Sequence, residues 1–243
     1  MNERDLQLAE AISEIMDETN EPSIYLIHTK YTNVVRVNLA VLKAFLERKA
    51  KKVIMITIDR PHQYVSHLMQ LHGINQNNLF FIDAISAHSS DTKGDSADSV
   101  PQRGPFNIET LPEFLLNSEK ENLGPLADLT RIGFIVIDNV STLLIYNTTE
   151  SVKRFFENYL RATKDFKPST VLTAVVMDRD QQPVLFEFIS DFSKKVLEVG
   201  PEMTVKIVHE MGDLTKKIPS PVPQATLESD RSEQAVLKDK EVI

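Results

Sequence analysis

Residues 132–144 of this chain read IGFIVIDNVSTLL, an apolar run that ends at Asp138. A continuous apolar run is typical of a strand that is buried on both faces, as in a parallel sheet covered by helices on either side. Asp138 would then stand at the carboxyl end of a buried strand, which is where open α/β sheets bind ligands. The same residues also fit a simpler role, because an Asp after a strand commonly only closes the turn.

Apolar runs and amphipathic segments alternate along most of the chain around this stretch. Strands are predicted at Ser23–His28, Lys52–Ile58, Leu79–Asp83, Gly133–Asp138, Thr170–Met177, Val184–Ile189, Lys195–Val199 and Thr204–His209. Helices are predicted at Leu6–Met16, Val34–Arg48, Gln63–His72, Ile108–Leu116 and Val152–Thr163. Strands alternating with helices, followed by a terminal hairpin, predict an α/β fold with a mostly parallel central sheet and a C-terminal antiparallel edge.

The composition restricts the class of protein. The chain has 243 residues, of which 42% are hydrophobic, a formal net charge of -8 and no cysteine. The negative charge disfavours a nucleic-acid partner, and the absence of cysteine excludes disulfides and thiolate metal sites. No apolar stretch approaches the roughly 20 residues that cross a bilayer, so we expect no membrane span and a location in the cytoplasm.

The distribution of residue types predicts one domain with a tail. Residues 1–212 carry the alternating pattern, interrupted by a polar segment at 86–105 that we expect to be a mobile loop outside the core. From residue 213 to 243 the composition shifts to Pro, Ser, Lys and Asp, which predicts a disordered tail.

A second informative stretch, IYLIHTKYTNVVR at residues 24–36, leads from a strand through a polar loop into a helix. Phosphate-binding loops lie at such junctions, where they are built from glycines that admit the anion and a lysine that reaches it. Here the loop contains no glycine. In the absence of a phosphate, we expect the side chain of Thr32 or Asn33 to cap the helix that begins near Val34.

The order of these elements resembles that of the RecA-type ATPases, specifically the RadA/KaiC-like branch, over roughly residues 20–212. The run Ile135–Leu144, IVIDNVSTLL, is similar to the family's apolar strand ending in IDS, and Phe188–Glu198 resembles a late strand entry of that branch. The resemblance implies a RecA-like three-layer sandwich. It also gives Asp138 a Walker-B-like position, where the family's aspartate holds magnesium.

The same resemblance implies that the phosphate loop is degenerate. It places residues 28–35 (His28, Thr29, Lys30, Tyr31, Thr32, Asn33, Val34, Val35) at the loop, with His28 and Asn33 at its glycines. Val34 takes the place of the lysine and Val35 that of the hydroxyl residue, so the phosphate and magnesium contacts are lost. At the water-activating position the family's acidic pair is replaced by Asp59 and Arg60, which we expect to form a solvated ion pair.

The remaining candidate residues give weaker signals. His62, His67 and His72 are five residues apart, which scatters them around a helix, and we expect no metal site there. Ser141 lacks the G-x-S-x-G setting of a hydrolase nucleophile. An atypical anion pocket formed by Lys30 and Arg36 at the start of the helix stays open as an alternative, in which a nucleotide would be bound by these two residues and Asp138.

These observations predict a catalytically inactive homologue of the RecA/KaiC-like ATPases, a pseudo-ATPase without a cofactor, that regulates or scaffolds through protein–protein contacts. The expected partner is a protein, such as an active paralogue or a second copy of this chain. One rival is a nucleotide-binding switch or an ATPase with an atypical phosphate loop. Another is a doubly wound signalling module that is phosphorylated on Asp59 or Asp138.

Overall fold

A single eight-stranded sheet runs through the protein, with the strand order β4-β3-β2-β5-β6-β1-β7-β8. It is seen in a computed structural model that describes residues 1–16, 21–48, 52–84, 99–101, 108, 111–113, 132–165 and 171–210. The strands are β1 (Ser23–His28), β2 (Lys52–Thr57), β3 (Leu79–Asp83), β4 (Ser99–Pro101), β5 (Ile132–Ile137), β6 (Leu172–Met177), β7 (Ser193–Val199) and β8 (Val205–Glu210). Every neighbouring pair is parallel except β7 and β8, which confirms the predicted sheet and its antiparallel edge.

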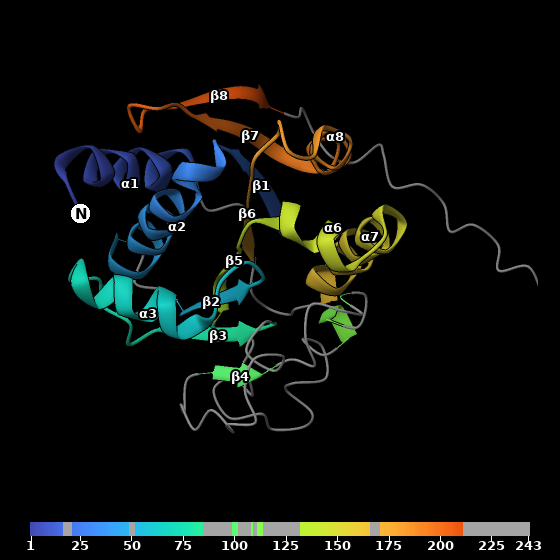
Figure 1. The fold of residues 1–243 in the computed structure, drawn as a ribbon, viewed down its shortest axis with the longest axis horizontal. Helices are drawn as coiled ribbons and strands as arrows, with labels where there is room; N and C mark the ends of the chain where they lie inside the picture. Colours follow the sequence, from blue (N-terminus) through green and yellow to red (C-terminus); the bar gives the residue numbers. More distant parts are fainter. Residues whose placement is uncertain are drawn as a thin grey trace, which may run out of the picture. The chain divides into compact units, whose positions relative to one another are not determined.

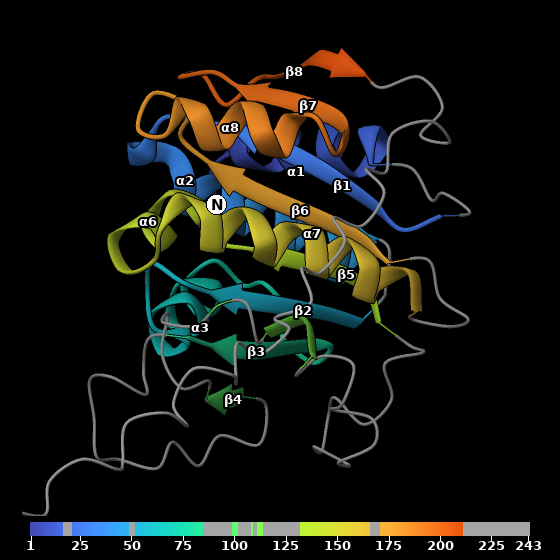
Figure 2. The ribbon, with the colours of Figure 1, turned by 90° about the vertical axis from the view of Figure 1, so that its right-hand side faces the viewer.

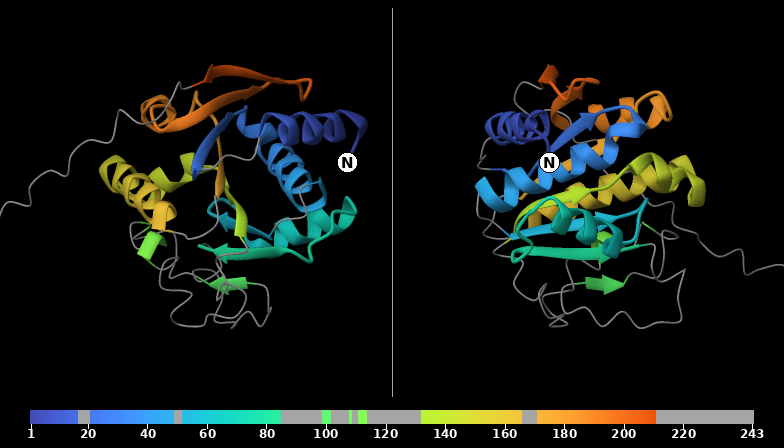
Figure 3. Two further views of the ribbon diagram at one scale, coloured as in Figure 1. Left: turned by 180° about the vertical axis from the view of Figure 1, so that it is seen from behind. Right: turned by 60° about the vertical axis from the view of Figure 1, so that its left-hand side comes forward.

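Helices cover both faces of this sheet. They are α1 (Glu3–Ile15), α2 (Val34–Lys43), α3 (His62–Leu71), α6 (Leu143–Tyr146), α7 (Thr149–Asp165) and α8 (Pro183–Ser190), with short turns η1 (Tyr31–Asn33), η2 (Ala44–Arg48) and η6 (Val140–Thr142). Figure 1 shows α1, α2 and α3 on one face and α6, α7 and α8 on the other. The same two layers are seen from behind and from the side in Figure 3. The protein is therefore a three-layer α/β sandwich.

Each face of the sheet has its own apolar core, because successive side chains of a strand point to opposite sides. In β2, Met55 belongs to the cluster under α1, α2 and α3, whereas Ile54 and Ile56 belong to the cluster under α7 and α8. Strands buried on both faces explain why the sequence shows continuous apolar runs and no alternation with polar residues.

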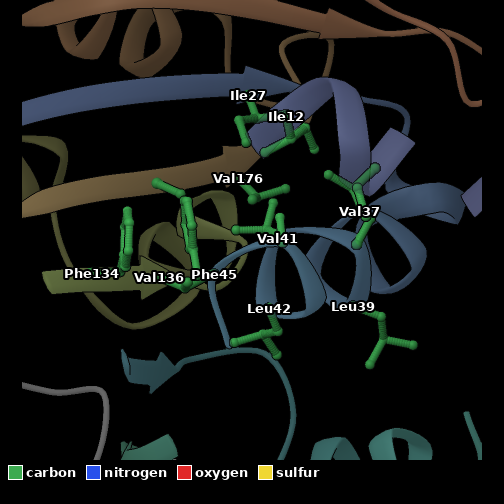
Figure 4. Close-up of a cluster of buried hydrophobic side chains, with 14 of the residues drawn as sticks. Ile12, Ile27, Val37, Leu39, Val41, Leu42, Phe45, Phe134, Val136 and Val176 are labelled. Carbon is green, nitrogen blue, oxygen red and sulfur yellow. The ribbon is translucent and has the colours of Figure 1, made fainter. Parts of the chain in front are cut away.

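The first core is centred on an aromatic pair. Phe45 in η2 stacks on Phe134 in β5, with ring centroids 3.7 Å apart and planes 10° apart. Figure 4 shows the two rings beside Val136, at the end of the helix that carries Val37 and Val41 toward the sheet. The stack fixes the carboxyl end of this helix against the middle of the sheet.

The prediction of a strand at Val184–Ile189 was wrong, since these residues lie in α8. β6 and β7 both run parallel to β1, so the chain between them must cross over, and a helix makes that crossover where a tight turn cannot. Leu185, Phe186 and Ile189 are buried at helical spacing, and Pro183 occupies the start of the helix, where a proline is tolerated. The C-terminal hairpin was predicted correctly as β7 and β8.

Part of the segment 86–105 also differs from the prediction. Ser99–Pro101 form β4, which pairs with β3 at the edge of the sheet. An edge strand needs backbone partners on one side only, so a polar segment containing Pro101 can form it. The rest of that segment lies outside the described residues, as do the predicted tail at 213–243 and most of the helix predicted at Ile108–Leu116.

The stacked pair gives a test of the core. Phe45→Ala is expected to lower the free energy of unfolding by about 3–5 kcal/mol, because it removes a fully buried ring and leaves a cavity against Phe134. Leu71→Ala, at a side chain that is 65% exposed, serves as the control and is expected to change stability by no more than about 0.5 kcal/mol. Urea denaturation of the two variants makes the comparison, and equal effects would contradict the packing described here.

Candidate functional site

Aspartates gather at the carboxyl edge of the sheet, where β2, β3, β5 and β6 end. Figure 2 shows these strands with their arrowheads pointing to the same side of the molecule. Asp83 ends β3, Asp138 and Asp178 directly follow β5 and β6, and Asp59 lies two residues after β2. Strand alternation continues from Phe81, Val136 and Val176, which point into the first core, and places the carboxylates of Asp83, Asp138 and Asp178 on the side of α2 and α3.

Two of these carboxylates bind the starts of helices that follow neighbouring strands. Asp83 accepts hydrogen bonds from the backbone nitrogen of His62, at 2.8 Å, and lies 2.5 Å from the Nδ1 atom of the same residue. Asp178 accepts from the backbone nitrogen of Tyr31 at 2.8 Å and from that of Asp180 at 2.9 Å. The row of acids therefore satisfies backbone groups that a bound anion could otherwise contact.

The loop after β1 is occupied by such internal bonds. Besides the bond from Tyr31 to Asp178, backbone nitrogens of the loop donate to carbonyl oxygens of the protein. These bonds run from Thr29 to Met177 at 3.0 Å, from Asn33 to Lys30 at 2.8 Å and from Val34 to Tyr31. The expected cap was wrong, because neither Thr32 nor Asn33 caps α2 through its side chain. A turn of 3₁₀ helix, η1, precedes α2 instead, and its first N–H is satisfied by a carboxylate from another strand.

Asp138, for which the sequence resemblance predicted a Walker-B-like position, lies beneath α2. It is 1% exposed, and its carboxylate accepts a hydrogen bond of 2.6 Å from the side-chain nitrogen of Asn38. Burial and the nearby carboxylate of Asp59 raise the pKa of Asp138 to about 7, although Arg60 and the hydrogen bond from Asn38 act in the opposite direction. The side-chain oxygen of Asn38 has no hydrogen-bond partner among the described residues.

Asp59 and Arg60, which the sequence resemblance assigned to a water-activating position, do form the expected ion pair, at 2.6 Å. The pair is less solvated than predicted, because the two side chains are only 11% and 24% exposed. Asp59 also accepts a hydrogen bond of 3.0 Å from the hydroxyl of Thr142 in η6, and the guanidinium of Arg60 lies 5.8 Å from the ring centre of Tyr31. These contacts join the loops after β1, β2 and β5.

Positions that the sequence resemblance assigned to magnesium and water chemistry meet in one small cavity. Val35, Asn38, Arg60, Tyr64 and Asp138 line it together with Leu39, Met55, Val65 and Leu68. Its volume is about 10 Å³. A space of this size admits a single water molecule, whereas small-molecule sites usually occupy roughly 300 Å³ or more. The lining also lacks the lysine and the serine or threonine hydroxyl that a magnesium–triphosphate group needs, so the residues present do not fit that group.

The other predicted site residues each contact a different partner. Lys30 forms an exposed ion pair with Asp180, and Arg36 pairs with Asp5 of α1 at 2.6 Å. His28 accepts a hydrogen bond from the backbone nitrogen of Arg179 at 3.1 Å. Lys30, Arg36 and Asp138 therefore have separate partners and do not converge on one pocket.

The histidines have separate roles as well. His62 contacts Asp83, and the amino group of Met1 lies 2.8 Å from the Nδ1 atom of His72. Within the described ranges, no group of three or more His, Cys, Asp or Glu side chains has an arrangement that could hold a metal ion. Over the same residues, no helix has the length and apolar character required to cross a membrane.

Sequence reasoning missed Asn38, His62, Thr142 and Asp178 as members of this site. Asp178 and Asp83 carried a usable signal, because each stands at the end of a buried strand in the same way as Asp138. Asn38 carried a weaker one, since it is a polar residue on the otherwise apolar, buried side of α2. Nothing in the sequence indicates that Thr142 would meet Asp59.

Comparison with known proteins identifies the fold alone. No family model matches this chain, and no curated protein matches it. Solved structures do match, among them the crystal structure of an uncharacterized protein, PH0321 from Pyrococcus horikoshii, in complex with an unknown peptide. That structure is 15% identical in sequence with a TM-score of 0.62, and the match covers 83% of this chain and 89% of the other.

The carboxylate of Asp178 can be tested by removal. Asp178→Ala is expected to destabilise the protein by about 1–3 kcal/mol, since the backbone nitrogens of Tyr31 and Asp180 lose a buried acceptor. Asn33→Ala is the matched control in the same loop and is expected to have little effect, because its side chain does not cap α2. Chemical denaturation measures both, and a larger loss for Asn33→Ala would contradict this description of the loop.

Asp138 gives a test by pH. Its pKa is raised in the folded protein from 3.8 to about 7, so the folded state retains a proton that the unfolded chain releases. The contribution of Asp138 to the stability of the wild type should therefore fall as the pH rises between about 4 and 7, by at most about 1.4 kcal/mol per pH unit. Asp138→Asn cannot ionise but can still accept from Asn38, so its stability relative to wild type should increase across that window and level off above it.

Denaturation of the wild type and of Asp138→Asn at matched pH values gives the difference between their free energies of unfolding directly, because other titrating groups contribute equally to each. Parallel stability curves would show that Asp138 is ionised in the folded protein throughout the range, and would contradict the raised pKa.

Proposed function

We propose that this protein is a RecA-type α/β protein, similar to the RadA/KaiC-like ATPases, that neither hydrolyses nor binds ATP and acts by contact with another protein. The observation that carries the proposal is the shared cavity of Val35, Asn38, Arg60 and Asp138. In P-loop enzymes the hydroxyl after the lysine and the Walker-B aspartate hold one magnesium ion, so their positions must lie close together. Here Val35 and Asp138 line the same cavity, but valine has no hydroxyl with which to hold a magnesium ion.

The side chains in the cavity replace the functions of an ATP site. Val35 offers no oxygen ligand, and Asn38 donates directly to the carboxylate that would face the metal ion. Arg60 places a cation where the family has a second acid, and it is held by Asp59. This arrangement supports a site that is closed by its own polar groups.

The electrostatics of the loop support the same proposal. A triphosphate at the start of α2 would meet the carboxylates of Asp178 and Asp180, and like charges at close range are repelled. Lys30, the lysine of the loop, is paired with Asp180. The backbone nitrogen of Tyr31 already donates to the carboxylate of Asp178.

A function through protein contact is the complementary half of the proposal. The similar protein PH0321 was crystallised with an unknown peptide, and a peptide-binding role for this chain is a natural extension of that finding. The net charge of -8 is in keeping with a protein partner in the cytoplasm and not with a nucleic acid. We infer a regulatory or scaffolding role, with an active paralogue or a second copy as candidate partners.

The rival function is a nucleotide-binding switch that uses Lys30, Arg36 and Asp138. In the structure Arg36 is engaged by Asp5 of α1, so the switch would require the break of that ion pair. A phosphorylated signalling module is also disfavoured, because Asp138 is 1% exposed and Asp59 is held by both Arg60 and Thr142.

Thermal denaturation with and without MgATP distinguishes the proposal from its rival. A ligand at 100 times its dissociation constant stabilises a protein by about 2.7 kcal/mol, and we expect no such shift here. MgADP and the metal ion alone are the controls for weaker or metal-only binding. A rise in melting temperature with MgATP that Asp138→Ala abolishes would overturn the proposal.

A further inference from the structure

Large exposed apolar side chains gather at the carboxyl edge of the sheet. Of the nine that the described part of the chain exposes, five lie on loops or first helical turns that follow the parallel strands. We define these five as the carboxyl-edge surface: Tyr31 (40% exposed), Tyr64 (45%), Ile145 (72%), Tyr146 (39%) and Val184 (65%). They come from the connections after β1, β2, β5 and β6, which are four adjacent strands.

Side-chain and backbone contacts connect these segments with one another. Arg60 reaches the ring of Tyr31 and lines the cavity together with Tyr64. Asp59, next to Arg60, accepts from Thr142, which directly precedes the helix that carries Ile145 and Tyr146. The loop of Tyr31 is bonded to Asp178 in the turn that leads to Val184. The segments that carry the five side chains are therefore linked with one another at the carboxyl edge of the sheet.

Each cation named on this edge is paired with an acid of the same chain. Lys30 pairs with Asp180, Arg60 with Asp59, and Arg179 with Glu187 at 2.8 Å. A strongly charged partner would have to break these pairs, whereas an uncharged apolar segment would not. Tyrosine is also a residue that protein interfaces use as an anchor, because its large ring loses little conformational freedom on binding.

We propose that the carboxyl-edge surface binds an uncharged segment of a partner protein, which places apolar side chains against Tyr31, Tyr64, Ile145, Tyr146 and Val184. This inference rests on the proposed function, since it assigns a surface to the protein contact suggested there. A nucleic acid is a poorer match, because the arginines and the lysine of this edge are neutralised by acids. The edge that the resemblance links to nucleotides would then serve to recognise a polypeptide.

A random peptide library displayed on phage, selected against the full chain, provides the probe. We expect the selected peptides to be rich in apolar and aromatic residues and poor in charged ones. Synthetic versions should bind Ile145→Asp and Val184→Asp about tenfold more weakly or worse, because a new charge must be desolvated within the interface. Leu71→Asp is the matched control, since Leu71 at the end of α3 is 65% exposed, as Val184 is, and its variant should bind as wild type does.

The outcomes separate this inference from the proposed function. Peptides that bind Ile145→Asp and Val184→Asp as well as wild type would overturn the assignment of this surface while leaving a protein-binding role in place. Selection of charged peptides, or of none, would also overturn it. Self-association measured by light scattering and abolished by Ile145→Asp would assign the surface to a second copy instead. Stabilisation by MgATP would count against the proposed function independently of any peptide result.

Discussion

Each parallel strand delivers the chain to the same edge of the sheet, where the following helix begins with backbone N–H groups that need acceptors. In this protein neighbouring strands supply the acceptors. Asp178 after β6 binds the first N–H of η1, which follows the adjacent strand β1. Asp83 at the end of β3 binds the first N–H of α3, which follows the adjacent strand β2. The helix starts and the strand order are thus held together by the same bonds.

This arrangement explains why neither helix start uses a local side-chain cap. Asn33 stands at the cap position of α2 and Pro61 at that of α3, and neither caps its helix through a side chain. A carboxylate near a helix start also interacts favourably with the helix dipole. The backbone N–H groups that phosphate-binding proteins offer to an anion donate here to carboxylates of the chain itself. Their hydrogen-bonding capacity is therefore satisfied without a ligand.

The interior and the surface of this edge then have different properties. Beneath α2, Asp138 is buried with Asn38 and Arg60 around a space for one water molecule, and ionising it is costly because of its burial and the nearby Asp59. Above it, tyrosines and aliphatic side chains are exposed between ion pairs that are already satisfied. A closed interior beneath an apolar surface fits contact with a polypeptide better than chemistry on a small molecule, and both proposals depend on this contrast.

The sequence alone determined the architecture, because buried parallel strands need continuous apolar runs, and those runs at residues 132–137 and 52–57 are visible without a structure. It also showed that the loop at residues 28–35 has no glycine, and that valines stand at the two positions where the resemblance would place a lysine and a hydroxyl residue. The tertiary structure alone decided that Val184–Ile189 form a helix, since only the parallel pairing of β7 with β1 requires a crossover there. It alone showed which groups close the site: Asp178 reaches Tyr31 from 147 residues away, and Asn38 reaches Asp138 from 100 residues away. Such pairs depend on strand order, and no local pattern of residues encodes which strand ends will be neighbours.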